Sequence, residues 1–199
     1  MRTPIRSAIP KRSAVLARAS YRAYKAELRA DFGSRCGYCD DLDSYSGGVR
    51  SYHIDHFAPK SLFSHLETEY TNLVYSCPYC NISKSDKWHG TDPTPSHNGQ
   101  IGFIDPCQEE YDDHLTRLET GEIMGLTPLG RHLIKELSLS LIRHRLIWAL
   151  QRLDEIQRSL LSMQEQIADD DPRYNELARV LMQVWREINI RRDRLNEAQ

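Results

Sequence analysis

Cys36-Gly37-Tyr38-Cys39 begins the most informative segment of this chain, which continues through His53-Ile54-Asp55-His56, Tyr70-Thr71-Asn72-Leu73 and Cys77-Pro78-Tyr79-Cys80-Asn81 to Lys84 and Trp88. Each Cys-x-x-Cys pair can turn two thiolates toward one point, and four thiolates together suit a tetrahedral zinc ion. A simple zinc ribbon separates its pairs by roughly 15–20 residues, whereas the interval here is about twice as long and contains the His/Asp/His cluster. We therefore expect Cys36, Cys39, Cys77 and Cys80 to hold a structural zinc, and the insert to carry the chemistry.

The length and the cysteine usage set the broad class of the protein. Its 199 residues are enough for one domain with a sizeable core or for two small domains. No apolar signal-peptide core follows the basic start, and no apolar run approaches the ~18–20 residues that span a membrane, so we expect a soluble, cytoplasmic protein. Paired cysteines in a reducing compartment favour metal over disulfides. The remaining cysteine, Cys107, is expected to be a buried structural thiol.

The net charge of −2 conceals an uneven distribution of charge along the chain. Residues 1–35 hold nine Lys and Arg against two acidic residues, whereas residues 36–125 hold five against fifteen. Residues 126–199 are nearly balanced, with twelve against eleven. A basic segment beside an acidic module suggests that nucleic acid is bound by that segment or by a partner. A solvated basic helix is the alternative interpretation.

Hydrophobic spacing predicts a short series of elements in the first half of the chain. Apolar residues recur at helical spacing from Lys11 to Phe32. Two short strands are expected, around Tyr52–Phe57 and Leu73–Tyr75, the second leading into the second cysteine pair. A helix is expected from about Asn81 to Trp88, followed by a long loop over 89–106, where prolines and glycines are frequent.

The last third of the chain has the pattern of a helical hairpin. Thr127 can cap a helix that has Pro128 at its first position, and we expect one helix of about 40 residues, ~60 Å long, from this point. Apolar residues then recur in steps of three and four, at Leu139, Ile142, Leu146, Ala149, Leu153, Ile156, Leu160, Met163 and Ile167. The sequence Asp169-Asp170-Asp171-Pro172 breaks this helix, and a second apolar series follows. The two apolar seams either pack only on each other or leave a surface for a second subunit.

The central cluster has the groups that are needed to cut a phosphodiester bond. Such a cut requires a base that activates water and a cation that neutralises charge on the phosphate. An imidazole has an ordinary pKa of about 6.5, so His56 can accept a proton at neutral pH. Asp55 and the Asn81 side-chain oxygen are hard ligands that suit Mg²⁺ or Mn²⁺. A zinc ion with four sulfur ligands is closed, so the catalytic ion needs a site of its own.

Two further polar residues accompany this cluster. Asn72 directly precedes the second strand, where its amide could pin the loop that returns from His56. His53 lies two residues before Asp55 and therefore on the same side of the strand. It could approach the same catalytic ion, or it could be a hydrogen-bonding neighbour.

Three lysines are candidates for contacts with nucleic acid. Lys84 follows Asn81 by about one helical turn, where it could touch a phosphate, and Lys60 and Lys87 lie near the cluster in sequence. For Lys84 and Lys87 a solvated helix face is the alternative.

The segment resembles the HNH endonuclease superfamily, whose fold is a small ββα-metal finger. The matching residues are the Asp55-His56 pair, Asn72-Leu73 and Cys80-Asn81-x-x-Lys84. The resemblance implies that His56 is the general base, that Asp55 and Asn81 bind the catalytic ion, and that Asn72 orders the loop. The last position of the motif is Asn81 rather than His, as in many members.

A narrower resemblance is to the PtuB-like HNH subunit of Septu-type anti-phage systems, which is also found with some retrons. It is carried by Cys36-x-Tyr38-Cys39, His56-Phe57-x-Pro59-Lys60-Ser61, Asn72-Leu73-Val74-Tyr75-Ser76-Cys77 and Phe103-Ile104-Asp105-Pro106, together with His114, Gly121-Glu122-Ile123 and Leu137-x-Leu139 with Arg143 or Arg145. The resemblance implies an anti-phage nuclease that acts with an ABC-type ATPase subunit.

We therefore predict a mainly α protein with a small ββα-metal (HNH) finger. The expected organisation is a basic N-terminal helix over 1–35, the zinc-bearing nuclease finger over 36–90, a connecting loop region over 91–126 and a long helical hairpin over 127–199, which could also mediate homo-oligomerisation. The expected function is a metal-dependent endonuclease acting on DNA. The alternatives are a non-catalytic zinc module that binds nucleic acid or acts as a scaffold, and an HNH nuclease that cuts RNA.

Overall fold

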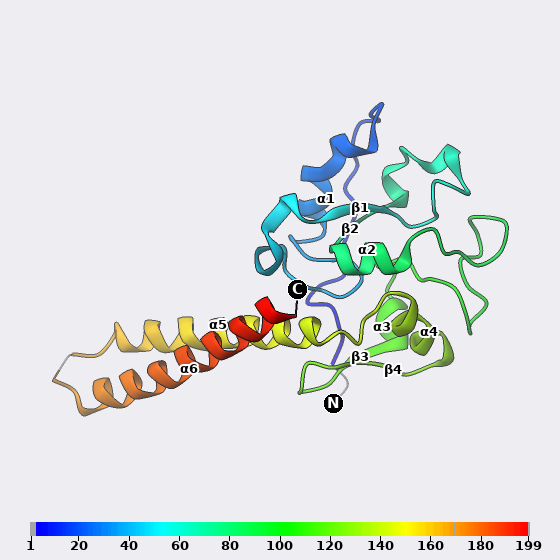
Figure 1. Cartoon of the computed structure of the whole chain (residues 1–199). Coiled ribbons are helices and arrows are strands. Elements are labelled where there is room, and N and C mark those ends of the chain that lie inside the picture. The colour runs from blue at the N-terminus through cyan, green and yellow to red at the C-terminus, as the bar shows by residue number, and fades with distance from the viewer. Residues whose placement is uncertain (1–2, 169, 199) are drawn as a thin grey trace. The chain divides into compact units, whose positions relative to one another are not determined.

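The computed structural model describes residues 3–168 and 170–198, and the chain divides into two compact units, Met1–Leu141 and Ile142–Gln199 (Figure 1). The first unit contains the cysteine pairs and two small antiparallel sheets. The second unit is a pair of long helices. The predicted fold class, mainly α with a small ββα finger, is confirmed.

The N-terminal helix is much shorter than its apolar spacing predicts. The described chain has no helix before Tyr21; a 3-10 turn, η1 (Tyr21–Tyr24), then leads into the helix α1 (Lys25–Asp31). The predicted start at Lys11 is wrong because the polar groups of this segment bond to distant parts of the chain. Arg12 pairs with Asp105 at 2.8 Å, and the backbone N–H of Ser13 donates to Asp31. Tertiary contacts of this kind override helix propensity.

The finger consists of two strands and one helix. β1 (His53–His56) pairs antiparallel with β2 (Leu73–Ser76), with His53 opposite Ser76 and His56 opposite Leu73. The helix α2 (Pro78–Lys84) follows β2 directly. Both strands agree with the prediction, but the helix begins three residues earlier and ends four residues earlier than expected.

The bounds of α2 have local causes. Cys77 caps the helix through its sulfur, which accepts the N–H of Cys80, and Pro78 takes the first position, where a missing N–H costs nothing. Ser85 has φ +51°, which a helix cannot continue through. Several 3-10 turns connect these elements, namely η2 (Asp43–Ser46), η3 (Gly48–Arg50), η4 (Ser64–Leu66) and η5 (Tyr70–Asn72).

A second small sheet lies in the segment that the sequence analysis treats as a connecting loop. The one-turn helix α3 (Tyr111–His114) leads into β3 (Leu115–Arg117), which pairs antiparallel with β4 (Ile123–Gly125), and α4 (Pro128–Glu136) follows. Strands of three residues are too short to give a period-2 signal. A side chain at Gly130 would bring its Cβ within 1.9 Å of the His114 carbonyl oxygen, so glycine is required where α4 packs on this sheet.

The core of the first unit is rich in tyrosine as well as aliphatic residues. Its fully buried side chains include Leu28, Tyr38, Leu73, Val74, Tyr75, Ile104, Tyr111, Leu115, Leu129 and Leu133. Buried tyrosines need partners for their hydroxyl groups. Tyr38 donates to Asp55, and Tyr75 donates to Asp43. The core therefore contains fixed polar contacts, and one of them reaches the catalytic cluster proposed from the sequence.

The second unit consists of α5 (Ile142–Gln164) and α6 (Pro172–Glu197), which lie side by side. The hairpin and its break before Pro172 agree with the sequence, although Asp169 lies outside the described residues. The single helix expected from Thr127 is wrong: α4 ends at Glu136, and Ser138 has φ +54°. Among the described residues, no helix is both long enough and apolar enough to cross a membrane.

Candidate metal centres and active site

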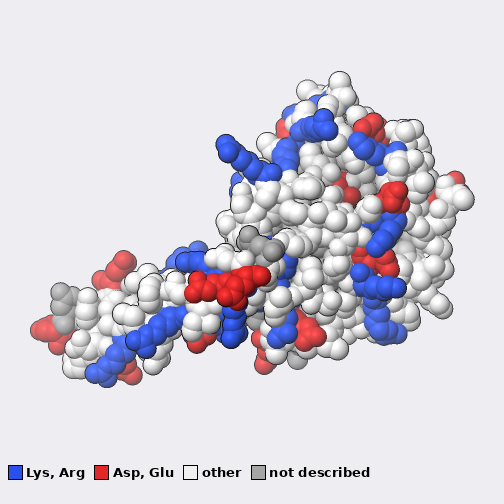
Figure 2. Space-filling view, in the orientation of Figure 1, with Lys and Arg blue, Asp and Glu red and all other residues white. Residues whose placement is uncertain are grey.

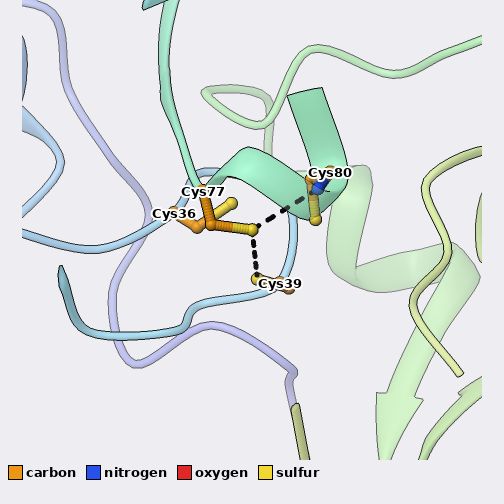
Figure 3. A group of neighbouring side chains, drawn as sticks. All are labelled: Cys36, Cys39, Cys77 and Cys80. Carbon is orange, nitrogen blue, oxygen red and sulfur yellow. Dashed lines mark hydrogen bonds between the residues drawn. The ribbon is translucent and has the colours of Figure 1, made fainter. Parts of the chain in front are cut away.

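The four paired cysteines converge in the first unit. Cys36 and Cys39 lie in the turn after α1, Cys77 caps α2, and Cys80 lies in its first turn. Their Sγ atoms all lie within 4.8 Å of one another (Figure 3), and all four residues are buried. The predicted grouping of Cys36, Cys39, Cys77 and Cys80 is therefore what the fold produces.

The spacing and chemistry of this cluster fit zinc. Sulfurs bound to one tetrahedral zinc at ~2.3 Å are ~3.8 Å apart, and the sulfurs of Cys39 and Cys77 are separated by 3.8 Å. This distance is far longer than the ~2.05 Å bond of a disulfide, and the thiols are free. Burial opposes the Cys36 thiolate, but hydrogen bonds from the other three sulfurs outweigh it and lower the Cys36 pKa well below its ordinary value.

Asp55 is buried on β1 and is held by two groups from outside the strand. The Tyr38 hydroxyl donates to Oδ2 at 2.6 Å, and the Lys84 ammonium lies 3.3 Å from the same oxygen. Burial raises the pKa of Asp55, and the contacts with Lys84 and Tyr38 oppose this by favouring the carboxylate. Both of these partners contact Oδ2, and the backbone N–H of His56 also donates to the carboxylate.

His56 is the next residue on β1, and its ring is held in one tautomer. Nε2 lies 2.9 Å from the carbonyl oxygen of Glu67, and a carbonyl can only accept, so Nε2 must carry the proton. The neutral ring then has its lone pair on Nδ1. Burial lowers the pKa of His56, although the Glu67 carbonyl opposes this. The ring is therefore set up as a neutral base, and Tyr21 packs against it edge-on at 4.7 Å between centroids.

Asn81 and His53 meet across the gap between α2 and β1. The amide nitrogen of Asn81 lies 3.0 Å from Nδ1 of His53. His53, Asp55, His56 and Asn81 line one cleft of about 400 Å³, with Lys60 also in its wall. The fold thus brings the four predicted polar residues of the cluster to one cavity. A carboxylate, an amide and an imidazole form a donor set that fits a hard divalent cation.

Asn72 joins the two ends of the loop between β1 and β2. Its side-chain oxygen accepts the N–H of Ala58 at 2.8 Å, and its amide donates to the carbonyls of Ala58 and Leu66 at 3.0 and 3.3 Å. Glu67, whose carbonyl holds His56, follows Leu66 directly. Asn72 therefore supports the loop segment that orients the His56 ring.

The three predicted lysine contacts lie in different environments. Lys84 is fully buried, donates to the His56 carbonyl at 2.8 Å and pairs with Asp55, so its ammonium does not face a substrate as expected from the sequence. Lys60 lies at the cleft, 2.9 Å from the Glu67 carboxylate. Lys87 pairs with Glu136 of α4 at 2.8 Å and is not part of the cleft wall. Only Lys60 is placed to meet a ligand in the cleft.

Residues 36–87 match the family model of the HNH endonucleases. The match covers both cysteine pairs, β1, β2, α2 and the cleft between them, and together with the four-cysteine cluster it fits the HNH superfamily. An HNH domain supports a nuclease or nucleic-acid-binding role. No curated protein and no solved structure gave a match to the chain.

Sequence reasoning missed two features of the site. The first is Tyr38, since nothing in the sequence indicates that its hydroxyl reaches a carboxylate 17 residues further on. The Glu67 carbonyl has no side-chain signal at all, since it acts through the backbone. Cys107, expected to be a buried thiol, is half-buried, and burial raises its pKa to about 12.

Proposed function

We propose that this chain is a metal-dependent HNH endonuclease that hydrolyses DNA phosphodiester bonds. The observation that carries the proposal is the state of His56, with Nε2 fixed on the Glu67 carbonyl and the Nδ1 lone pair available. This base lies in the same cleft as Asp55 and Asn81. A non-catalytic zinc module would have no use for a histidine held in this way beside a buried carboxylate.

In the proposed reaction His56 removes a proton from the attacking water at Nδ1. The Glu67 carbonyl fixes the tautomer, and a lowered pKa keeps the ring unprotonated at neutral pH. Asn72 holds the preceding loop so that this carbonyl stays in place. Water attacks phosphorus and the 3′ oxygen leaves, so the expected products carry 5′-phosphate and 3′-hydroxyl ends.

Asp55 and Asn81 would hold the catalytic cation, Mg²⁺ or Mn²⁺, with His53 as a third neighbour. When bound, such a cation supplies the positive charge that neutralises the phosphate and the leaving oxygen. Lys84 and Tyr38 contact Oδ2 of the Asp55 carboxylate and so fix its orientation. The four cysteines would hold a separate, structural zinc at the start of the helix that carries Asn81.

The test compares two single histidine variants in a plasmid-nicking assay with Mg²⁺ or Mn²⁺. His56→Ala should abolish cleavage and leave zinc content and folding unchanged, because the base is removed without touching the cysteines. General-base catalysis contributes ~10²–10⁴-fold, so a loss of at least that size is expected. His65→Ala is the matched control, since His65 is an exposed histidine of η4 outside the cleft wall. Full cleavage by His56→Ala would end the assignment, as would zinc-loaded wild-type protein with no nuclease activity.

We further propose that the nuclease is the effector of an anti-phage system and works with an ABC-type ATPase subunit. The support for this is the resemblance of motifs beyond the matched segment, such as Phe103-Ile104-Asp105-Pro106 and Gly121-Glu122-Ile123. Co-expression with such an ATPase should yield a complex that survives size-exclusion chromatography, and two separate peaks would contradict it. RNA is the alternative substrate, and the same cleavage assay with labelled RNA distinguishes it. Homo-oligomerisation through α5 and α6 stays a prediction that sedimentation can check.

A further inference from the structure

Most of the positive charge of the basic N-terminal segment is neutralised by ion pairs within the chain. Five of its arginines form ion pairs: Arg6 with Asp112, Arg12 with Asp105, Arg18 with Glu27, Arg29 with Asp43 and Arg35 with Asp40. Four of these five acidic partners belong to the acidic module that follows. The segment as a whole is therefore not a free cationic arm. The charges that remain available for a ligand must be sought individually.

Arg22 and Arg50 are exposed, and they line the same groove. This groove has a volume of about 560 Å³, and its wall also contains Lys25, Tyr52 and His53. Arg22 stacks over the ring of Tyr21 at 5.5 Å, and Arg50 ends the η3 turn. The Lys25 ammonium donates to the Tyr52 carbonyl, so this lysine is held against the wall of the groove and is less available to a ligand than Arg22 and Arg50. Among the acidic residues of the described chain, none lines this groove.

The groove is continuous with the candidate active site. Tyr21, His53 and Ile54 line both the groove and the 400 Å³ cleft. The cleft wall also includes Asp86 and Lys60, and Lys60 pairs with Glu67, whose pKa is lowered mainly by that hydrogen bond and to a smaller extent by the charge of Arg22. The acidic side chains Asp55 and Asp86 thus line the cleft but not the groove, where the lining charges are positive. Basic side chains project from the upper left of this unit in Figure 2, where Figure 1 places α1 and the start of β1.

We propose that this groove, formed by Tyr21, Arg22, Lys25, Arg50 and His53, is a binding track for a nucleic-acid backbone. Arg22 and Arg50 bind phosphates on one side of the scissile bond, and Tyr21, shared with the cleft, marks the passage from track to active site. Guanidinium groups suit phosphate oxygens through paired N–H donors. The role of the track in cleavage rests on the proposed nuclease function, whereas backbone binding does not.

The test is a binding measurement with the full-length His56→Ala chain, so that the probe stays intact. Fluorescence anisotropy with a short labelled DNA duplex is recorded over a salt series, for the parent and for Arg22→Gln/Arg50→Gln. Each lost phosphate contact lowers the slope of log K against log salt by ~0.9 for duplex DNA, so the double variant should lose ~1.8 in slope and at least ~10-fold in affinity at ~0.1 M salt. Arg22→Lys/Arg50→Lys should keep most of the slope, because the charges remain.

Arg131→Gln/Lys135→Gln is the matched control, since it removes two exposed positive charges from α4 of the same unit, outside the groove. An equal loss of affinity and salt slope in both double variants, or no loss in the Arg22→Gln/Arg50→Gln variant, would overturn the proposal. A parallel series with an RNA duplex shows whether the groove binds the backbone of DNA or of RNA. A loss of affinity in the groove variant but not in the control variant, with either duplex, supports the proposal. Cleavage is assayed separately on the chain with His56 intact: if it fails while groove-dependent binding persists, the nuclease function fails and the track stands.

Discussion

The finger that contains the four-cysteine cluster and the α5–α6 hairpin differ in how the sequence determines their structure. The hairpin is built from two repeating apolar patterns, and it still exposes apolar side chains, at Ile156, Leu161, Met163, Val180, Met182, Trp185 and Ile190. The finger instead buries polar groups: Asp55, His56, Asn72 and Lys84 all lie inside it with fixed partners. A helix pair is determined by periodicity, whereas the finger depends on individual contacts that cannot be exchanged for one another. The two regions should therefore respond very differently to single substitutions.

The largest expected effect is the loss of zinc. Cys80→Ser should abolish zinc binding and unfold the finger, because zinc contributes about 10–16 kcal/mol in small zinc-finger peptides, as much as the ~5–15 kcal/mol stability of a whole domain. Since all four ligands lie between residues 36 and 80, amide protection in α5 and α6 should persist. Metal analysis and hydrogen exchange measure both effects. Cys107→Ser is the control and should retain zinc; unchanged protection in the finger of the Cys80 variant would refute the prediction.

A smaller effect is expected when the buried ion pair of the finger is broken. Lys84→Met leaves the Asp55 carboxylate buried without its cation, which should lower the free energy of unfolding by about 3–5 kcal/mol. Lys87→Met, which breaks an exposed pair with Glu136, should cost less than about 1 kcal/mol. Urea unfolding monitored by tyrosine and tryptophan fluorescence compares the two variants. Equal losses of unfolding free energy in the two variants would show that the buried ion pair of the finger matters no more to stability than a pair at the surface.

The smallest effect is expected in the hairpin, at the start of α6. Asp171 accepts the N–H of Arg173 and pairs with its guanidinium, and the side-chain and backbone hydrogen bonds of Arg173 lower the pKa of Asp171 to about 2. The contribution to stability is therefore complete above the ordinary pKa of ~3.9 and is lost as the pH falls through about 2. Asp171→Ala should lower the melting temperature slightly at neutral pH and make this part of the acid dependence disappear. Asp171→Asn should keep the cap and lose only the acid dependence; calorimetry across pH distinguishes these outcomes.

The same contrast explains what could be predicted from the sequence. The grouping of the four cysteines, the placement of Asp55 and His56 in one cleft and the hairpin could be predicted because each follows from a local pattern of spacing. The N-terminal helix was overestimated because Arg12 and Ser13 bond to residues far along the chain, which no window of sequence contains. Lys84 is buried and meets neither a phosphate nor solvent, which could not be predicted because helical spacing alone does not show that this side of α2 packs against β1. The contact of the Glu67 carbonyl with His56 could not be predicted, since every residue has a backbone carbonyl and the side chain gives no signal.

One consequence follows from the helix α2, which carries Cys80 in its first turn and Asn81 directly after it. If Cys80 binds zinc and Asn81 binds the catalytic ion, as proposed, the two ligands are adjacent on one seven-residue helix, and Asn81 would be positioned only once zinc has fixed that helix. A newly synthesised chain would then be inert until it acquires zinc, and starvation for the metal would silence it rather than release a loose nuclease. If the proposed nuclease function is correct, this order of assembly would keep the chain from cutting nucleic acid before its finger has folded.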